Sequence, residues 1–195
     1  MKKAPTLIYT LCILLVLFCS IKWAEAKDDW CLTAYSALMS GDSLGDVLAF
    51  SADFDDSYYL FALALSKRVG SFHQYLDFEI EGQAVNHFED QEYMEYNAVF
   101  VARWLPFPWD NHINTSLAVG SGLSYVTETS EIEALNHDET SRLLAYLLFE
   151  LAFSLPDSPK WSLVARLHHR SGVDGLFGNV RGASNALGLG IKYRF

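Results

Sequence analysis

The sequence predicts an all-β protein, an eight-stranded antiparallel barrel whose strands cross an outer membrane. Hydrophobic residues make up 51% of the chain and aromatic residues 14%, but after residue 26 no apolar run reaches the roughly 18 residues expected of a spanning helix. Segment after segment alternates between apolar and polar side chains, as strands with two unlike faces do. The chain also ends in an alternating strand that finishes at Phe195, which is typical of the closing strand of an outer-membrane barrel.

Residues 1–26 are predicted to be a secretory signal peptide. The segment has a positively charged start, an apolar run over 7–18 and a small-x-small cleavage site that ends at Ala26. The apolar run is too short for a comfortable spanning helix. The mature chain, residues 27–195, is then long enough for one barrel domain in the outer membrane of a Gram-negative bacterium.

The charge and the cysteine content exclude several classes of protein. The formal net charge of −10 argues against nucleic acid as a partner, because surfaces that bind nucleic acid are basic. Cys31 is the one cysteine after the predicted leader, so neither an internal disulfide nor a structural zinc site is expected. Four scattered histidines lack a second ligand at metal-binding spacing and are expected on the surface: His73, His87, His112 and His137. No metal or organic cofactor is expected.

Eight alternating segments follow the leader. Each is about 10 to 13 residues long, close to the roughly 9 to 11 residues of a tilted strand that crosses a membrane. They are predicted at 29–39, 57–69, 72–83, 93–105, 115–126, 142–155, 160–171 and 184–195. An even number of antiparallel strands can close into a ring without a free edge, as a bilayer requires.

Turn-forming residues separate the first four segments. Two Gly-Asp pairs between residues 41 and 46 indicate a loop after the first segment. Gly70-Ser71 is the expected turn between the second and the third, and an acidic loop is predicted over 87–92. Pro106, which cannot donate to a strand ladder, ends the fourth segment.

The last four segments contain one ambiguous stretch. Residues 115–126 alternate clearly and lead into a long polar loop at 127–140. Residues 142–155 could also be a buried helix, because short apolar runs are ambiguous, but the period-two placement of Glu150 favours a strand. A tight turn is predicted at 156–159, before the last two strands.

The face that this alternation directs inward carries charges of both signs. Its acids are Glu79, Glu81 and Glu150, and its bases are Arg103, Arg166, Lys192 and Arg194. The interior of an eight-stranded barrel is just wide enough for side chains. We therefore expect an internal salt-bridge network, because a catalytic carboxylate in such an interior would have no route for substrate.

One pair of side chains suggests chemistry. On the outward face of residues 160–171, the apolar residues are followed in the same phase by His169 and Ser171, about 6 to 7 Å apart along the strand. Polar side chains that face lipid are costly unless they lie at the membrane interface. An imidazole one pleat away can reach a serine hydroxyl and act as its base. The other interpretation is a polar pair at the point where the strand leaves the membrane.

A small outer-membrane barrel with His-x-Ser at 169–171 on its penultimate strand, a Gly-rich turn and an aromatic terminal strand resembles the lipid A 3-O-deacylase (PagL) family. The resemblance covers the mature chain in architecture, and its specific residues lie in 161–195. Members of this family are eight-stranded barrels whose Ser-His-Glu triad faces the outer leaflet and hydrolyses an ester-linked acyl chain of lipid A. The resemblance implies that His169 is the general base and Ser171 the nucleophile.

Two positions depart from the family pattern. Gly172 follows the serine where the family often has asparagine, so the oxyanion donor is either missing or a backbone N–H group at this position. No glutamate follows Glu150, so the third member of the triad is either Asn185, which shares the outward phase, or Asp174 in the turn. Asn185 is slightly favoured.

The resemblance implies an outer-membrane serine esterase that removes an ester-linked acyl chain from lipid A or another outer-leaflet lipid, taken laterally from the membrane. The alternative is a barrel of the same architecture without catalytic activity, with a role in membrane integrity or adhesion. A soluble barrel that carries a ligand is a third possibility, against which the outward apolar faces and their aromatic ends argue. A closed barrel has no edge that requires a second subunit, so no particular oligomeric state is predicted.

Overall fold

The computed structural model describes residues 22–23, 30–88, 93–129, 141–180 and 182–195. The predicted leader therefore lies outside the described residues, except for Lys22–Trp23, which forms β1 and pairs with β3 at Gly70 and Ser71. The predicted loops at 87–92 and 127–140 also fall largely outside the described part of the chain.

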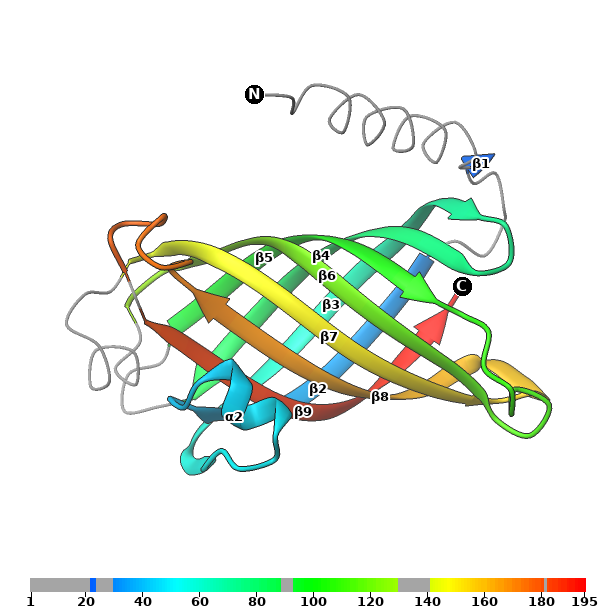
Figure 1. Cartoon of the computed structure of the whole chain (residues 1–195), viewed down its shortest axis with the longest axis horizontal. Coiled ribbons are helices and arrows are strands. Elements are labelled where there is room, and N and C mark those ends of the chain that lie inside the picture. The colour runs from blue at the N-terminus through cyan, green and yellow to red at the C-terminus, as the bar shows by residue number, and fades with distance from the viewer. Residues whose placement is uncertain (1–21, 24–29, 89–92, 130–140, 181) are drawn as a thin grey trace, which may run out of the picture.

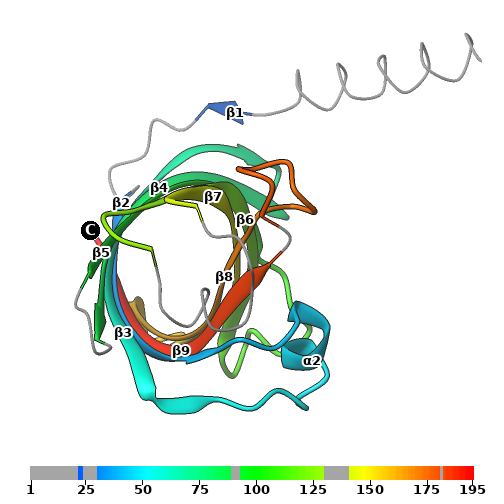
Figure 2. The same ribbon diagram turned by 90° about the vertical axis from the view of Figure 1, so that its left-hand side faces the viewer.

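The described residues form the predicted eight-stranded antiparallel barrel (Figure 1). Its strands are β2 (Trp30–Ser40), β3 (Asp55–Phe72), β4 (Leu76–Phe88), β5 (Tyr93–Trp104), β6 (Asn114–Val126), β7 (Leu143–Leu155), β8 (Ser158–Ser171) and β9 (Ala183–Arg194). Each strand pairs with the next along the chain, and β9 returns to pair with β2, so the ring closes (Figure 2). The ambiguous stretch at 142–155 is a strand, as predicted.

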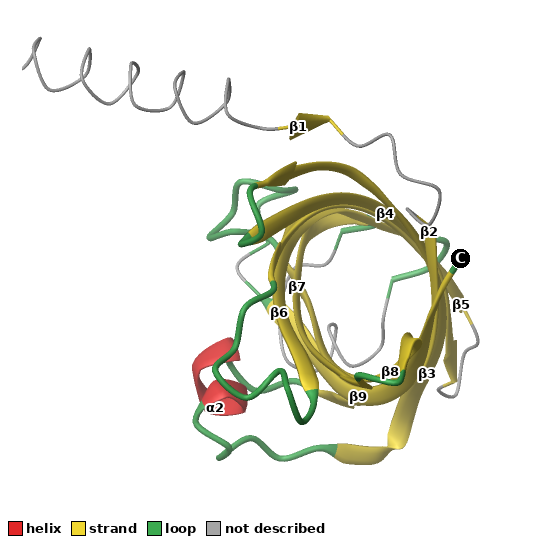
Figure 3. Ribbon diagram, turned by 90° about the vertical axis from the view of Figure 1, so that its right-hand side faces the viewer, coloured by secondary structure: helices red, strands yellow, loops and turns green. Residues whose placement is uncertain are grey.

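The two ends of the barrel differ in the length of their connections (Figure 1). The C-terminus and the short β3–β4 and β7–β8 connections share one end, and Figure 3 shows the molecule from that side. The longer β2–β3, β6–β7 and β8–β9 connections share the other end. In outer-membrane barrels the short turns are periplasmic and the long connections extracellular, so we name the second end the outer end.

The β2–β3 connection contains the one helix of the described residues, α2 (Leu44–Leu48), which the sequence did not predict. No helix within the described ranges has the length and apolar character needed to cross a bilayer. α2 lies outside the barrel wall beside β9 (Figures 1, 2 and 3).

The alternation of side chains fixes the two surfaces of the wall. On β4, Glu79 and Glu81 are buried in the lumen, while Ile80 between them is 52% exposed on the outside. The same pattern gives every strand an exposed apolar outer face, which forms a belt suited to lipid. At the β2–β9 seam the wall is tight, because a Cβ atom at Gly190 would lie 2.5 Å from Tyr35 Cβ.

The predicted salt-bridge network fills the half of the lumen that lies farther from the outer end. Arg103 donates to Glu79 (2.6 Å) and to Glu150 (2.8 Å). Arg166 binds Glu150 (2.5 Å) and, through two nitrogens, Glu81 (2.9 Å for each). Lys192 also binds Glu150. The prediction is confirmed for these six side chains, whereas Arg194, which was expected among them, is exposed.

A second polar group lies farther toward the outer end. Glu95 accepts from Ser124 (2.8 Å) and lies 2.7 Å from His87 Nε2 and 3.0 Å from His168 Nε2. The expectation that His87 is a surface residue was wrong, because its side chain is buried on the lumen face of β4. Its position at the end of a strand next to a predicted loop concealed this role.

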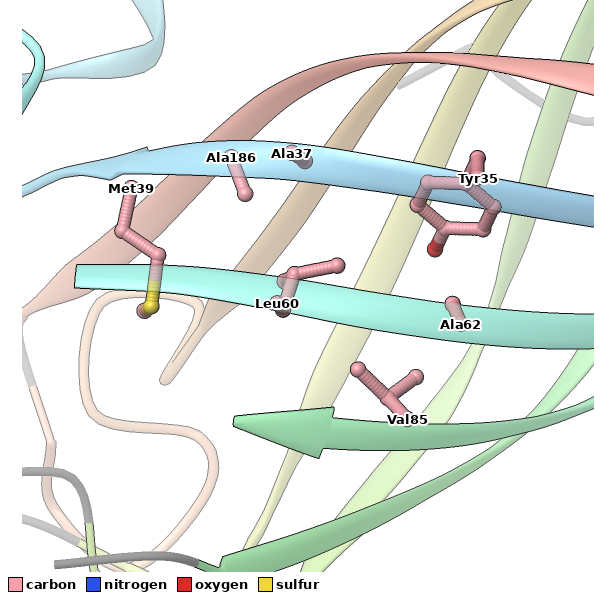
Figure 4. Packing of buried hydrophobic residues seen from close by; sticks show 7 residues of the cluster. All are labelled: Tyr35, Ala37, Met39, Leu60, Ala62, Val85 and Ala186. Carbon is pink, nitrogen blue, oxygen red and sulfur yellow. The ribbon is translucent and has the colours of Figure 1, made fainter. Parts of the chain in front are cut away.

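Apolar side chains also line the lumen. One cluster joins β2, β3, β4 and β9 on the inner face of the wall, as Figure 4 shows. Its members are Tyr35, Ala37, Met39, Leu60, Ala62, Val85 and Ala186. The interior is therefore packed with side chains rather than open, which agrees with the narrow lumen of an eight-stranded barrel.

The predicted turn at Gly70-Ser71 was wrong. Both residues lie inside β3 and pair with Phe78 and Asp77 of β4, next to a register shift after Arg68. The chain reverses at residues 73–75 instead. Glycine and serine indicate turns in general, but in this hairpin the reversal uses a histidine with positive φ, outside the usual turn residues.

Candidate functional site

Three polar side chains form a row on the outward face of the wall near the outer end. The row crosses three neighbouring strands, because Ser40 pairs with Asn185 in the β2–β9 ladder and Asn185 pairs with His169 in the β9–β8 ladder. Directly below the row, toward the middle of the barrel, Leu38 and Leu187 are exposed in the apolar belt. The row therefore marks the outer edge of that belt.

The row is buried although it faces outward. Asn185 is 1% exposed and His169 6% exposed. The side chain of His169 points outward from the barrel, as predicted, but it is buried and not exposed to lipid. The chain that leaves β2 after Ser40 accounts for the difference, because its residue Asp42 contacts Asn185 and its helix α2 lies against β9. We name residues 41–54 the first excursion.

Two hydrogen bonds fix the orientation of the imidazole. Asn185 donates through Nδ2 to the backbone carbonyl of Asp42 (2.7 Å), which turns its Oδ1 toward His169 Nδ1, also at 2.7 Å. Because an amide oxygen can accept but not donate, His169 carries its hydrogen on Nδ1. Its Nε2 then has the free lone pair and makes no hydrogen bond to another described residue. A histidine in this tautomer can take a proton at Nε2.

Ser171 lies one pleat beyond His169 on the same outward face. It is the last residue of β8, is half-buried and pairs with Ala145 and Ala183. Within the described part of the chain, no hydrogen bond joins its hydroxyl to His169 or to another side chain. The structure thus brings Ser171, His169 and Asn185 to one side of the wall, and the hydrogen bond that it shows among these three joins His169 to Asn185.

The other two predicted site residues lie in the β8–β9 connection. Asp174 is exposed, has a φ of 52° and makes no hydrogen bond to His169, so the structure favours Asn185 over Asp174 as the group behind the imidazole. The backbone N–H of Gly172 donates to the carbonyl of Gly182 (3.2 Å), so it is not free to bind an oxyanion in this conformation. A Cβ atom at Gly172 would lie 1.9 Å from the carbonyl oxygen of Val180, which explains glycine at this position.

The sequence analysis missed the part played by the first excursion. Ser43 caps α2 by accepting from Asp46 N–H (3.2 Å), and the Asp42 carboxylate accepts from the N–H of Asp53 (2.7 Å), which brings the two ends of the excursion together. The spacing of Ser43 and Asp46 matches a helix capping box and could have indicated α2. Asp42 binds Asn185 through its main chain, so no side-chain pattern could have revealed that contact.

No group of three or more metal-binding side chains occurs among the residues that the structure describes. The outward row contains the imidazole of His169, the amide of Asn185 and the hydroxyl of Ser40, without a carboxylate. The hydroxyl that could exchange a proton with the imidazole is that of Ser171, one pleat beyond His169 on β8.

Comparison with known proteins identifies the fold. No family model matches the chain, and no curated protein matches its sequence. Among solved structures the chain is similar to Neisserial surface protein A (NspA), with a TM-score of 0.53 and 14% identity over 85% of this chain and 97% of that one. The outer membrane enzyme PagL gives a TM-score of 0.54 and 14% identity over 84% and 98%. The N-terminal barrel domain of Pseudomonas aeruginosa OprF gives 0.51 and 11% over 86% and 98%.

These neighbours include a surface protein and an enzyme, so the likeness at this identity establishes a fold and not an activity. Together with the exposed apolar belt and the closed ring of strands, it identifies this chain as a small outer-membrane β-barrel of the Gram-negative type.

Proposed function

We propose that the protein is a serine esterase of the outer membrane that removes an ester-linked acyl chain from lipid A or another outer-leaflet lipid. The observation that carries this proposal is the pair of 2.7 Å hydrogen bonds that leave His169 Nε2 free on the face that bears Ser171. The similarity to the outer membrane enzyme PagL supports it at the level of architecture.

The position of the site supports a lipid substrate. The row of polar side chains lies at the outer edge of the apolar belt, next to Leu38 and Leu187. The ester groups of a membrane lipid lie at the same depth, between the acyl chains and the polar headgroup. A lipid that approaches Ser171 from the side would bring its ester to the hydroxyl without leaving the bilayer.

The reaction would proceed in two steps. Ser171 Oγ attacks the ester carbonyl while His169 Nε2 takes its proton, and the imidazolium then gives that proton to the leaving alcohol, which leaves an acyl-enzyme. Water, deprotonated by the same nitrogen, releases the fatty acid and restores the serine. Asn185 holds the imidazole and takes the place that a carboxylate has in the Ser-His-Glu pattern.

A barrel without catalytic activity is the second candidate. The absence of a hydrogen bond between Ser171 and His169 among the described residues favours it. So does the Gly172 N–H, which is engaged with Gly182. In a barrel of this kind, the polar row would hold the first excursion against the wall and would have a structural role only.

Mass spectrometry of lipid A from cells that express the protein tests both candidates. Wild-type protein is expected to remove one acyl chain, and Ser171→Ala is expected to lower the rate by a factor of roughly 10³ or more. Ser121→Ala is the matched control, because Ser121 is an exposed serine on the outer face of β6. Unchanged lipid A with folded wild-type protein would contradict the esterase on this lipid, and equal activity of Ser171→Ala would contradict the nucleophile.

A further inference from the structure

Two connections at the outer end flank the polar row. The first excursion leaves the wall from β2, and the β8–β9 connection, of which residues 172–180 are described, leaves it from β8. Since β2, β9 and β8 are neighbours in the ring, the two connections start on either side of the strand that carries Asn185. α2, in the first excursion, projects outside the wall at this point (Figure 2).

Both connections expose apolar side chains. In the first excursion, Phe50 is 92% exposed and Leu48 is also exposed, while Val47 is buried. In the β8–β9 connection, Leu176 is 76% exposed and Val173 is also exposed. Water is a poor environment for four such side chains on neighbouring loops, and exposed apolar patches mark binding surfaces.

The backbone conformation adds a second, independent observation. Phe50 has a φ of 57° and Val173 a φ of 50°, in the left-handed region that glycine and asparagine favour. A β-branched residue such as Val173 is unusual in that region, and each case costs free energy. Both residues thus combine an unfavourable backbone conformation with an exposed apolar side chain. Exposure of that side chain to water does not offset the free energy that the conformation costs.

We propose that the side chains of Leu48, Phe50, Val173 and Leu176 lie in the outer leaflet and contact its acyl chains. Continuity with the belt identifies this occupant, because the exposed Leu38 and Leu187 lie directly below the row from which the first excursion starts. Two of the nearby carboxylates are hydrogen-bonded, Asp42 to the N–H of Asp53 and Asp46 to the hydroxyl of Ser43, while the carboxylate of Asp174, next to Val173, is exposed.

This contact gives the polar row a lipid environment on two sides. Acyl chains beside the first excursion and beside the β8–β9 connection would lie next to the stretch of the outer face that holds His169 and Ser171. The inference does not require Ser171 to be a nucleophile, since it concerns where the two connections lie.

Fluorescence quenching tests the proposal. The variants Phe50→Trp and Leu176→Trp are placed, as full chains, in phospholipid bilayers with and without brominated acyl chains, and the emission of the wild type is subtracted. The native tryptophans of the described barrel lie toward the opposite end, at positions 30, 104, 109 and 161, so they report on a different depth. Asp157→Trp, in the exposed β7–β8 turn at that opposite end, is the control for a residue in water.

The added tryptophans at 50 and 176 are expected to emit at short wavelength and to lose most of their emission in brominated lipid, whereas the one at 157 keeps it. Long-wavelength emission without quenching at both positions would overturn the proposal and place the loops in water. Short-wavelength emission that bromine does not quench would also overturn it, and would indicate a second copy or another protein as the occupant. Heat-modifiable migration on a gel checks that each variant is folded.

Discussion

Replacing Glu150 with glutamine should strongly destabilise the barrel. Glu150 is buried in the lumen and accepts hydrogen bonds from Arg103, Arg166 and Lys192. With Glu79 and Glu81, the inner network contains three carboxylates and three cations, so its formal charges balance. Glu150→Gln keeps the shape of the side chain and leaves one buried cation without a partner charge.

The expected size follows from this imbalance. Removing one partner of a buried ion pair costs about 3 to 5 kcal/mol, because the remaining charge stays away from water. At about 1.4 kcal/mol for each factor of ten, the folding equilibrium falls by roughly 10² to 10⁴-fold. Lys192→Gln in the same background removes a cation and restores the balance, so the double variant should cost less than the sum of the single variants by about 0.5 to 3 kcal/mol.

Urea-induced unfolding in lipid vesicles, followed by tryptophan fluorescence, measures these differences as shifts in the midpoint at constant slope. Asp157→Asn, which removes an acidic group from the exposed β7–β8 turn, is the control and should stay within about 0.5 kcal/mol of the wild type. A loss below about 1 kcal/mol for Glu150→Gln would refute the reasoning, because it would mean that water solvates the network.

Two further predictions concern the polar row and the seam. Asn185→Ala removes the hydrogen bond to His169 and the bond to Asp42 that positions it, so the esterase rate should fall by roughly 10² to 10⁴-fold. The thermal stability of the barrel, measured alongside, separates misorientation from unfolding, and an unchanged rate would exclude Asn185 as the group that orients the base. Gly188→Ala would place a Cβ atom 2.2 Å from the carbonyl oxygen of Ser36, so the β2–β9 pairing should weaken by about 1 to 3 kcal/mol in urea unfolding, and a stability equal to the wild type would show that the seam can widen.

The barrel could be predicted from the sequence because successive side chains of a strand point to opposite faces, so that every second residue belongs to the same face. Acids at 79 and 81 alternate with Ile80, and this local pattern is enough to orient β4 in a wall of any curvature. The same phase correctly directed His169 and Asn185 outward. A turn depends instead on a few dihedral angles. Gly70-Ser71 has the composition of a turn but lies within β3, whereas the chain reverses at 73–75, where the sequence has no typical turn residue.

The environment of the candidate site could not be predicted in the same way. Burial of His169 depends on the first excursion, which starts at residue 41, and the register that brings Asp42 to Asn185 spans 143 positions of the chain. Every residue has a main-chain carbonyl, so the sequence does not single out that of Asp42, and only the folded structure reveals its contact with Asn185. The lumen position of His87 was missed for a related reason, since its partner Glu95 lies on the next strand beyond a predicted loop.

The seam between β2 and β9 has a consequence for biogenesis. Ser40 and Asn185 meet because the first and the last strand of the barrel pair, and the same pairing lets Asn185 reach Asp42. In a chain that has been synthesised but has not yet folded in the membrane, β2 and β9 are not paired and these residues lie apart. In the proposed esterase, the imidazole would thus acquire its orientation in the step that closes the ring. Before that step the catalytic groups would not be assembled, so a precursor could not hydrolyse the lipids of other compartments on its way to the outer membrane.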